Sequence, residues 1–391
     1  MPGALAFTGS GWLARISASM TSLSLLLLLT ETHNSYAVAG SVSAAYVLMA
    51  AIGGPLQARL VDTLGQRAVL LPLSIINLLA KLAMVATVVL GAALPIPQLC
   101  AALGGATSPL VGSYVRARWS NLIKDKAKLR TAFALESALE EICAVAGPPL
   151  AAFLAVQVSP VAGLAVAIAA CFGGTALLSL QRRTEPPVRS PSQTAKRDKF
   201  ARTPLIMLCL AAGGLGVIFG SINVTVVAFT SEHDARGVSG LLLAIMAGSS
   251  ILASLAVGAF KGKMSNYRQL QAGTIVTVAA ITPLLFVSDS RMLAVVLCAV
   301  SFGMSPAIIA TFSRVERIVP ASRLSEGMAW VTSAMIGGSA AGNSISGIFI
   351  DLSGGEAGFL VSLIAGILSA LLVQAMRLSA RDKRGMSDPG T

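Results

Sequence analysis

Long apolar stretches alternate with short polar gaps along nearly the whole chain. Roughly twenty apolar residues cross a bilayer as one helix. About twelve such stretches are present, near residues 12–30, 37–57, 68–91, 98–115, 132–155, 159–180, 204–229, 238–260, 270–288, 291–312, 327–350 and 357–376. They are rich in Leu, Ala and Gly and lack the strict alternation of barrel strands. The pattern predicts an all-α integral membrane protein with twelve transmembrane helices.

Basic residues occupy every second gap between these stretches. Of the 29 Lys and Arg residues, only Arg236, Arg291 and Lys81 depart from this alternation. Lys and Arg near the ends of membrane spans are kept on the cytoplasmic side during insertion. We therefore expect a multi-pass protein of the cell (inner) membrane, with the N- and C-termini both cytoplasmic.

The composition agrees with this interpretation. Of the 391 residues, 55% are hydrophobic and only 12% are charged, which is too apolar for a soluble protein of this length. A net charge of +12 would suggest nucleic acid in a soluble protein, but here the charges flank membrane spans and suit anionic lipid headgroups. We expect the lipid bilayer and a small-molecule substrate as partners, no nucleic acid, and a monomer. The Ala-, Gly- and Arg-rich composition is typical of a bacterium with GC-rich DNA.

The chain divides into two related halves. Residues 181–203 are rich in Pro, Ser and basic residues and are typical of a flexible cytoplasmic linker. We expect six-helix halves at 1–180 and 204–391, the second with a short cytoplasmic tail. A Ser-Pro pair precedes an arginine at Pro109 and again at Pro306. This order indicates a duplicated unit with a pseudo-two-fold axis along the membrane normal and a site between the halves.

The gap after the second stretch contains a recognisable pattern. It reads Ala58-Arg59-Leu60-Val61-Asp62-Thr63-Leu64-Gly65-Gln66-Arg67, followed by Leu70. It resembles the loop signature of the major facilitator superfamily, matching at Asp62, Gly65, Arg67 and Leu70 and departing at Ala58 and Gln66. The resemblance implies the transporter fold of that superfamily, with two pseudo-symmetric six-helix halves.

The chemistry of three residues in this loop suggests a physical role for each. Gly65 permits a tight turn, Asp62 can accept hydrogen bonds from a helix N-terminus, and Arg67 can pair with a carboxylate. In the superfamily the loop latches the halves together in the outward-open state, so Asp62 would meet the start of the eleventh span near Ser325–Gly327. The alternative is an ordinary charged loop dictated by topology.

Prolines in the spans predict helix bends. The fifth span contains Gly147-Pro148-Pro149, which looks like part of the Gly-Pro signature of the antiporter branch and favours export. A kink that serves only packing is the alternative. Pro109 and Pro306 predict further bends. The fourth span lacks the internal arginine of many proton-coupled members, because its first arginine, Arg116, is expected at the cytoplasmic end.

Ionisable residues inside spans are costly and suggest function. Glu136 and Glu140 share one face of the fifth span with Cys143 and Gly147, and Glu140 lies roughly 13 Å deep. An unpaired carboxylate there favours its protonated form, which suits a proton carrier. The alternative is a static pair with an arginine near the inner face: Arg15, Arg116, Arg118 or Arg130.

Lys81 lies near the middle of the third span and shares a face with Ser74 and Asn77. Because a lysine at that depth needs a partner, a pair with Glu140 is one hypothesis and a purely structural role is the other. The coupling candidates are Glu136, Glu140, Lys81 and Arg15.

The resemblance also implies a substrate cavity lined by the first, fourth, seventh and tenth spans. Its candidate residues are Ser17, Thr21, Ser24, Thr107, Ser108, Phe219, Asn223, Met304 and Ser305, each of which could equally be a packing residue. Few fixed charges among them would favour an apolar or weakly polar solute.

The most economical functional prediction is a secondary transporter that exports a small molecule by alternating access, driven by the proton gradient. The sequence contains no phosphate-binding loop, metal-ligand cluster or catalytic triad, so we expect no enzyme activity, no metal and no cofactor. A proton-coupled nutrient importer is the second hypothesis, and a membrane-embedded enzyme or scaffold is a third. The pattern leaves the substrate open.

Overall fold

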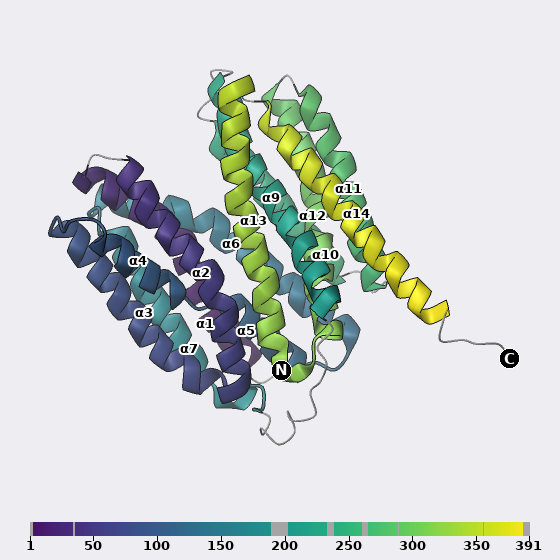
Figure 1. Cartoon of the computed structure of the whole chain (residues 1–391), viewed down its shortest axis with the longest axis horizontal. Helices are drawn as coiled ribbons and strands as arrows, with labels where there is room; N and C mark the ends of the chain where they lie inside the picture. The colour runs from purple at the N-terminus through teal and green to yellow at the C-terminus, as the bar shows by residue number, and fades with distance from the viewer. Residues whose placement is uncertain are drawn as a thin grey trace. The chain divides into compact units, whose positions relative to one another are not determined.

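The computed structural model contains long helices and no strand among the residues it describes (Figure 1). The described residues are 3–33, 36–188, 202–232, 238–259, 265–287, 289–354 and 356–385. The first half contains α1 (Ala4–His33), α2 (Tyr36–Leu64), α3 (Gln66–Val89), α4 (Ile96–Ala106), α5 (Val111–Leu122), α6 (Lys126–Gln157), α7 (Ala162–Leu180) and the 3-10 helix η1 (Arg182–Thr184).

The second half also consists of long helices with short 3-10 segments between them. It contains α9 (Arg202–Glu232), α10 (Ser239–Ala259), α11 (Asn266–Ile281), η3 (Thr282–Phe286), α12 (Ser290–Ile318), η4 (Ala321–Arg323), α13 (Leu324–Ser353) and α14 (Gly358–Gly385).

Within the described residues, ten helices are long and apolar enough to cross a membrane. The paired helices α4 and α5 supply an eleventh span and α13 supplies the twelfth. The prediction of an all-α membrane protein with twelve spans is therefore confirmed.

The fourth span is broken rather than bent. Helix α4 ends at Ala106 and α5 begins at Val111, with Pro109, which has no backbone N–H, between them. The side-chain amide of Gln57 donates to the carbonyl oxygens of Ala106 and Ser108 in the break. Since these groups would otherwise lack partners in a membrane, α2 stabilises the interruption.

This break corrects the predicted position of Arg116. The sequence places the fourth span at 98–115 and Arg116 at its end, but the helix continues as α5 to Leu122. Arg116 consequently lies inside the helical bundle, with only 1% of its side chain exposed. Helices α6 and α12 run through Pro148 and Pro306 without interruption.

The described chain forms two compact units. Unit 1 comprises Met1–Leu129, Leu139–Asp198 and Ala321–Ser333, and unit 2 comprises Arg130–Ala138, Lys199–Pro320 and Ala334–Thr391. The short segment Ala321–Ser333 thus belongs to the compact unit built mainly from the first half. The predicted division at 181–203 stays a prediction, and most of that linker lies outside the described residues.

Each unit is held by close helix contacts of the same kind. In unit 1, α1 packs on α7 and α2 packs on α4; in unit 2, α11 packs on α12 and α9 packs on α14. The approach of α2 and α4 requires glycine, because a Cβ at Gly105 would lie 2.1 Å from the carbonyl oxygen of Tyr46. Small residues allow such contacts where lipid provides no hydrophobic driving force.

A repeated hydrogen bond supports the internal duplication. Gln66, at the start of α3, donates its amide to the carbonyl oxygen of Tyr114 over 3.2 Å. Asn266, at the start of α11, donates in the same way to Ser313 over 3.1 Å. The counterparts lie about 200 positions apart in the sequence, so the relation between halves extends to individual contacts.

Candidate functional site

The turn between α2 and α3 begins at a glycine that the geometry requires. Gly65 has a φ of 91°, which side chains other than glycine rarely tolerate. Its N–H donates to the carbonyl oxygen of Val61 over 2.9 Å, closing the last turn of α2. This reversal positions Asp62 on the final turn of α2 and Arg67 on the first turn of α3.

Asp62 caps a helix that is remote in sequence. Its Oδ1 accepts a hydrogen bond from the backbone N–H of Ser325 (3.2 Å), and its Oδ2 accepts one from Glu326 (2.8 Å). These amides belong to the first turn of α13, where unsatisfied N–H groups and the helix dipole favour a carboxylate. All three residues lie in unit 1. The contact predicted for Asp62 near Ser325–Gly327 is confirmed.

An arginine compensates the negative charge beside this cap. Arg323 donates from Nε and Nη2 to the two carboxylate oxygens of Glu326, each over 2.8 Å. The bidentate geometry fixes both side chains. Since Glu326 is neutralised in this way, it repels the neighbouring carboxylate of Asp62 less.

Arg67 differs from its predicted role. Its backbone N–H, not its guanidinium group, donates to Oε1 of Glu185 over 2.9 Å. No hydrogen bond or ion pair joins the Arg67 guanidinium group to another described residue. The carboxylate that the sequence led us to expect therefore binds the backbone of α3, and within the described residues it forms no ion pair with the guanidinium group.

A buried arginine that the sequence suggested only as a possible partner of Glu140 forms other contacts and organises this region. Arg118 donates to Gln66 Oε1 (2.6 Å), to the carbonyl oxygens of Leu178 (2.8 Å) and Gln181 (3.1 Å), and to Thr184 Oγ1 (2.8 Å). It thereby fixes the end of α7 and the helix η1 against α3.

Inside the membrane-spanning part of unit 1, three helices bring a carboxylate and two arginines together. Arg116 Nη1 and Nη2 donate to Glu140 Oε1 (3.0 Å) and Oε2 (2.7 Å). Arg15 Nε lies 4.0 Å from Glu140 Oε1. Both arginines are buried, whereas 38% of the Glu140 side chain is exposed. Of the predicted partners of Glu140, Arg15 and Arg116 are the ones that the structure supplies.

The predicted face of α6 packs against α1. Successive contacts along the two helices join the pairs Arg15–Glu140, Trp12–Cys143 and Ser19–Gly147. A Cβ at Gly147 would lie 2.5 Å from the Cβ of Ser19, so glycine permits this approach. Glu136, one turn before Glu140, is completely buried.

Lys81 does not contact Glu140, and that predicted pair is wrong. Its Nζ lies 5.5 Å from the centre of the Tyr46 ring, and only 1% of the residue is exposed. The face shared with Ser74 and Asn77 is buried, as predicted, and Asn77 donates to the Gly104 carbonyl oxygen over 2.7 Å. Because α3 directs this face toward α2 and α4, Lys81 meets an aromatic ring and not a carboxylate.

The predicted cavity residues differ in accessibility. Ser108, Phe219 and Asn223 are partly exposed. The others are buried: Ser17, Thr21, Ser24, Thr107, Met304 and Ser305. The hydroxyl of Ser24 faces α7, since a Cβ at Gly163 would lie 2.7 Å from it. Internal packing thus accounts for most of these side chains, and no three His, Cys, Asp or Glu side chains gather as a metal site among the described residues.

We expect Gly112→Ala to disturb the Arg116–Glu140 pair. A Cβ at Gly112 would lie 2.7 Å from Glu140 Oε1 and 3.2 Å from Arg116 Nη1. Overpacking of this kind typically costs about 1–3 kcal/mol, so the melting temperature of the purified protein should fall. Gly173→Ala is the matched control, because nothing lies within 4 Å of a Cβ there, and its melting temperature should be unchanged or higher. Equal behaviour of the two variants would contradict the crowded geometry at Gly112.

Comparison with known proteins places the chain in a broad group of membrane transporters. A family model described as Major Facilitator Superfamily matches residues 7–290 and 208–390. An uncharacterised MFS-type transporter of Sinorhizobium fredii, y4rN, is 24% identical over 387 residues, covering 95% of this chain and 93% of the relative.

Solved structures share the fold at low sequence identity. The human organic anion transporter MFSD10 (TETRAN) has a TM-score of 0.73 at 16% identity, covering 95% of this chain and 100% of the other. A bacterial homologue of the iron transporter ferroportin has a TM-score of 0.77 at 13% identity, with coverages of 96% and 100%. The Escherichia coli fucose:proton symporter FucP has a TM-score of 0.75 at 12% identity, with coverages of 96% and 98%.

Proposed function

The chain belongs to the Major Facilitator Superfamily, and we propose that it exports a small molecule by proton-coupled alternating access. Family and fold make it a multi-pass secondary transporter and not an enzyme. In the proposed cycle, solute and proton bind near mid-membrane and each is released on the opposite side from which it bound. The proton gradient supplies the energy, and no cofactor takes part.

The observation that carries the proposal is the cluster of Arg116, Glu140 and Arg15. Two buried guanidinium groups hold one partly exposed carboxylate at membrane depth. While paired, Glu140 is stabilised in its charged form; when the pair opens, protonation becomes favourable because an isolated charge in a membrane is costly. Glu140 is therefore the proposed proton carrier, with Arg116 and Arg15 as the residues that position it.

The remaining coupling candidates, Glu136 and Lys81, are not the proposed proton carrier. Glu136 is buried one turn away on the same helix, and its role stays a prediction. Lys81 lies over the Tyr46 ring, so we assign it to packing within unit 1 and not to proton transfer.

Export is favoured over import by the Gly147-Pro148 pattern of α6. Gly147 lies where α6 approaches α1, and the same two helices carry Glu140 and Arg15. A change in the Arg15–Glu140 contact would consequently act where the two helices touch. This shared location supports a link between protonation and helix movement, as antiport requires.

The cap formed by Asp62 is the proposed latch. It holds the first turn of α13 against the end of α2 in one state of the cycle, and its release would free that turn in another. The basic ends of the spans support cytoplasmic termini and insertion in the inner membrane, and we propose a monomer as the working unit.

The direction of coupling can be tested in reconstituted vesicles. Purified protein would be oriented in liposomes that contain a pH-sensitive dye and then given a panel of apolar and weakly polar dyes and organic anions. We expect a solute gradient to drive protons in the opposite direction. Proton movement in the same direction as the solute would instead indicate symport, and absence of proton flux with every member of the panel would contradict proton-coupled export of these solutes.

A further inference from the structure

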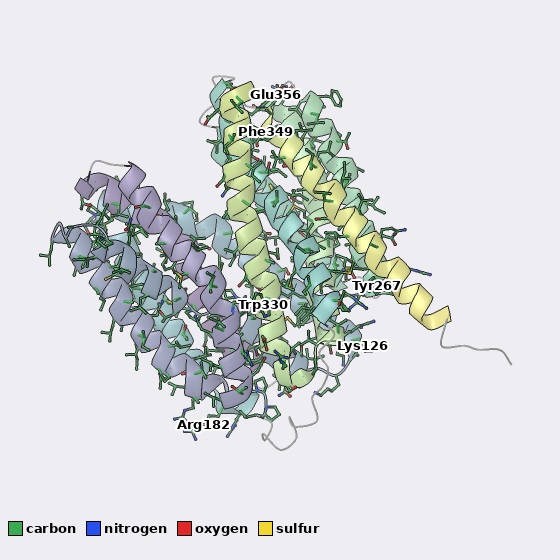
Figure 2. All side chains as sticks on the ribbon, viewed as in Figure 1. Lys126, Arg182, Tyr267, Trp330, Phe349 and Glu356 are labelled. Atoms are coloured by element: carbon green, nitrogen blue, oxygen red, sulfur yellow. The ribbon has the colours of Figure 1, made fainter. Side chains whose placement is uncertain are left out.

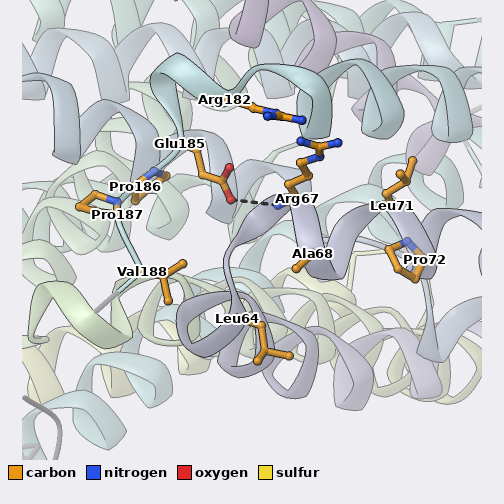
Figure 3. Close-up of a pocket in the computed structure, with 10 residues that line it drawn as sticks. All are labelled: Leu64, Arg67, Ala68, Leu71, Pro72, Arg182, Glu185, Pro186, Pro187 and Val188. Atoms are coloured by element: carbon orange, nitrogen blue, oxygen red, sulfur yellow. Dashed lines mark hydrogen bonds between the residues drawn. The ribbon is translucent and has the colours of Figure 1, made fainter. Parts of the chain in front are cut away.

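A cavity of about 680 Å³ opens beside the turn that joins α2 and α3, entirely within unit 1. Figure 3 shows its walls, which come from the end of α2, the first turns of α3 and the segment following α7. The residues that matter for its chemistry are Leu64, Arg67, Leu71, Pro72, Arg182 and Glu185. Figure 2 shows Arg182 at the lower end of the helices of this unit. None of these residues belongs to the proposed proton or substrate sites.

Two arginine side chains give the cavity a positive charge. The guanidinium groups of Arg67 and Arg182 extend toward the same side of the cavity (Figure 3). Throughout the described part of the chain, no hydrogen bond or ion pair joins either group to a carboxylate. Glu185 lines the same cavity, but its Oε1 accepts from the backbone N–H of Arg67. Since two like charges in one cavity repel each other, an anion between them would be stabilised.

The cavity is held open by buried contacts and is not a chance gap between loops. Arg118, which is fully buried, donates to Thr184 Oγ1 over 2.8 Å and so fixes the turn that carries Arg182. The hydrogen bond from the Arg67 N–H to Glu185 Oε1 joins α3 to the segment that follows α7. Gly65 lets the segment that follows α7 approach this turn, because a Cβ there would lie 2.9 Å from Val188 Cγ2 and 3.1 Å from Glu185 Oε1.

The apolar part of the cavity continues into the membrane-spanning surface of α3. Leu64 and Pro72 are exposed at its edge. Beyond them the exposed residues Ile75, Leu79 and Leu82 follow at helical spacing on one face of α3. A ligand that fits this surface is anionic at one end and carries a long apolar chain at the other.

We propose that this cavity binds an anionic phospholipid, with the headgroup phosphate between Arg67 and Arg182 and an acyl chain along the exposed face of α3. Arginine forms forked hydrogen bonds to phosphate oxygens, and basic pockets at the ends of membrane helices suit such headgroups. Binding is independent of the transported solute, so the proposal stands or falls separately from export.

The test uses the purified full-length protein in detergent. It is titrated with short-chain phosphatidylglycerol, with the matching phosphatidylcholine, and with inorganic phosphate, and bound lipid is counted by native mass spectrometry. We expect tighter binding of phosphatidylglycerol than of phosphatidylcholine and little binding of inorganic phosphate. Arg182→Gln should weaken phosphatidylglycerol binding by about tenfold, because it removes one of the two charged donors.

Arg183→Gln is the matched control. Arg183 is the neighbouring residue of η1, is exposed, and does not line the cavity. Its replacement removes the same charge and should leave lipid binding unchanged. Equal losses in the Arg182 and Arg183 variants would show a general surface effect and overturn the proposal. Binding of inorganic phosphate as tight as that of the lipid would also overturn it, in favour of a soluble phosphate ligand.

Discussion

Replacing Glu140 with Gln is expected to abolish proton-driven transport while leaving a folded protein. The substitution keeps the shape of the side chain but removes the charge that Arg116 binds with two hydrogen bonds. Hydrogen bonds to charged groups contribute roughly 1.5–3 kcal/mol. Because 38% of Glu140 is exposed, solvent screening should bring the loss near the lower end of that range. The measurement is solute-driven proton flux in vesicles, together with the melting temperature.

Two further variants separate the coupling role from stability. Glu141→Gln makes the same change one residue along α6 and should retain proton flux. Arg116→Lys keeps the positive charge but cannot form the bidentate contact, so an intermediate flux is expected. Full proton coupling in Glu140→Gln would rule out Glu140 as the proton carrier, whatever the melting temperature.

Asp62→Ala is expected to slow transport by about tenfold and to destabilise the protein. The carboxylate satisfies two backbone N–H groups of α13, and loss of such a cap typically costs about 1–2 kcal/mol. A shift of about 1.4 kcal/mol between two states changes their ratio tenfold. Asn can still accept one of the bonds, so Asp62→Asn should fall between Asp62→Ala and the unmodified protein. Initial transport rates in vesicles give the comparison.

Asp289 provides the control for this prediction. It caps α12 from the adjacent position, accepting from the N–H groups of Arg291 (2.6 Å) and Met292 (2.8 Å). The hydrogen bond from Met292, followed by that from Arg291, lowers the pKa of Asp289. The folded-state pKa lies below the ordinary value, so the contribution of this cap is present at neutral pH and is lost only as the pH falls through the folded-state pKa. Asp289→Ala should therefore lower the melting temperature at neutral pH without a matching loss of transport. Equal transport losses in both variants would reduce the Asp62 contact to an ordinary helix cap.

Sequence reasoning succeeded where a local pattern determines the result. The spacing of apolar stretches predicts the helices, and the loop at Asp62, Gly65 and Arg67 predicts both the glycine turn and the contact with Ser325–Gly327. The helices and the turn depend on residues that are close together in the chain. The contact with the start of the eleventh span was implied by the resemblance to the superfamily. The same loop was less informative for Arg67, whose guanidinium group forms no hydrogen bond or ion pair with a residue that the structure describes.

Sequence reasoning failed where the neighbouring helix decides the contact. Periodicity identified the buried face of Lys81, but nothing in it states that this face meets Tyr46 and not Glu140. Sequence reasoning also missed the hydrogen bonds that Arg118 forms, because two of its acceptors are the backbone carbonyl oxygens of Leu178 and Gln181. A backbone acceptor leaves no residue-type signal.

The Asp62 cap has a consequence for how the protein is made. Asp62 and its partner Ser325 are separated by 263 positions, and the segment that carries Ser325 is part of unit 1. At roughly 5–20 residues per second, the ribosome finishes that segment on the order of tens of seconds after it has made Asp62. During that interval unit 1 lacks the segment Ala321–Ser333. The carboxylate of Asp62 therefore lacks the two backbone N–H groups that it binds in the complete unit. Unit 1, although most of it is synthesised first, is therefore complete only after most of the chain has been inserted.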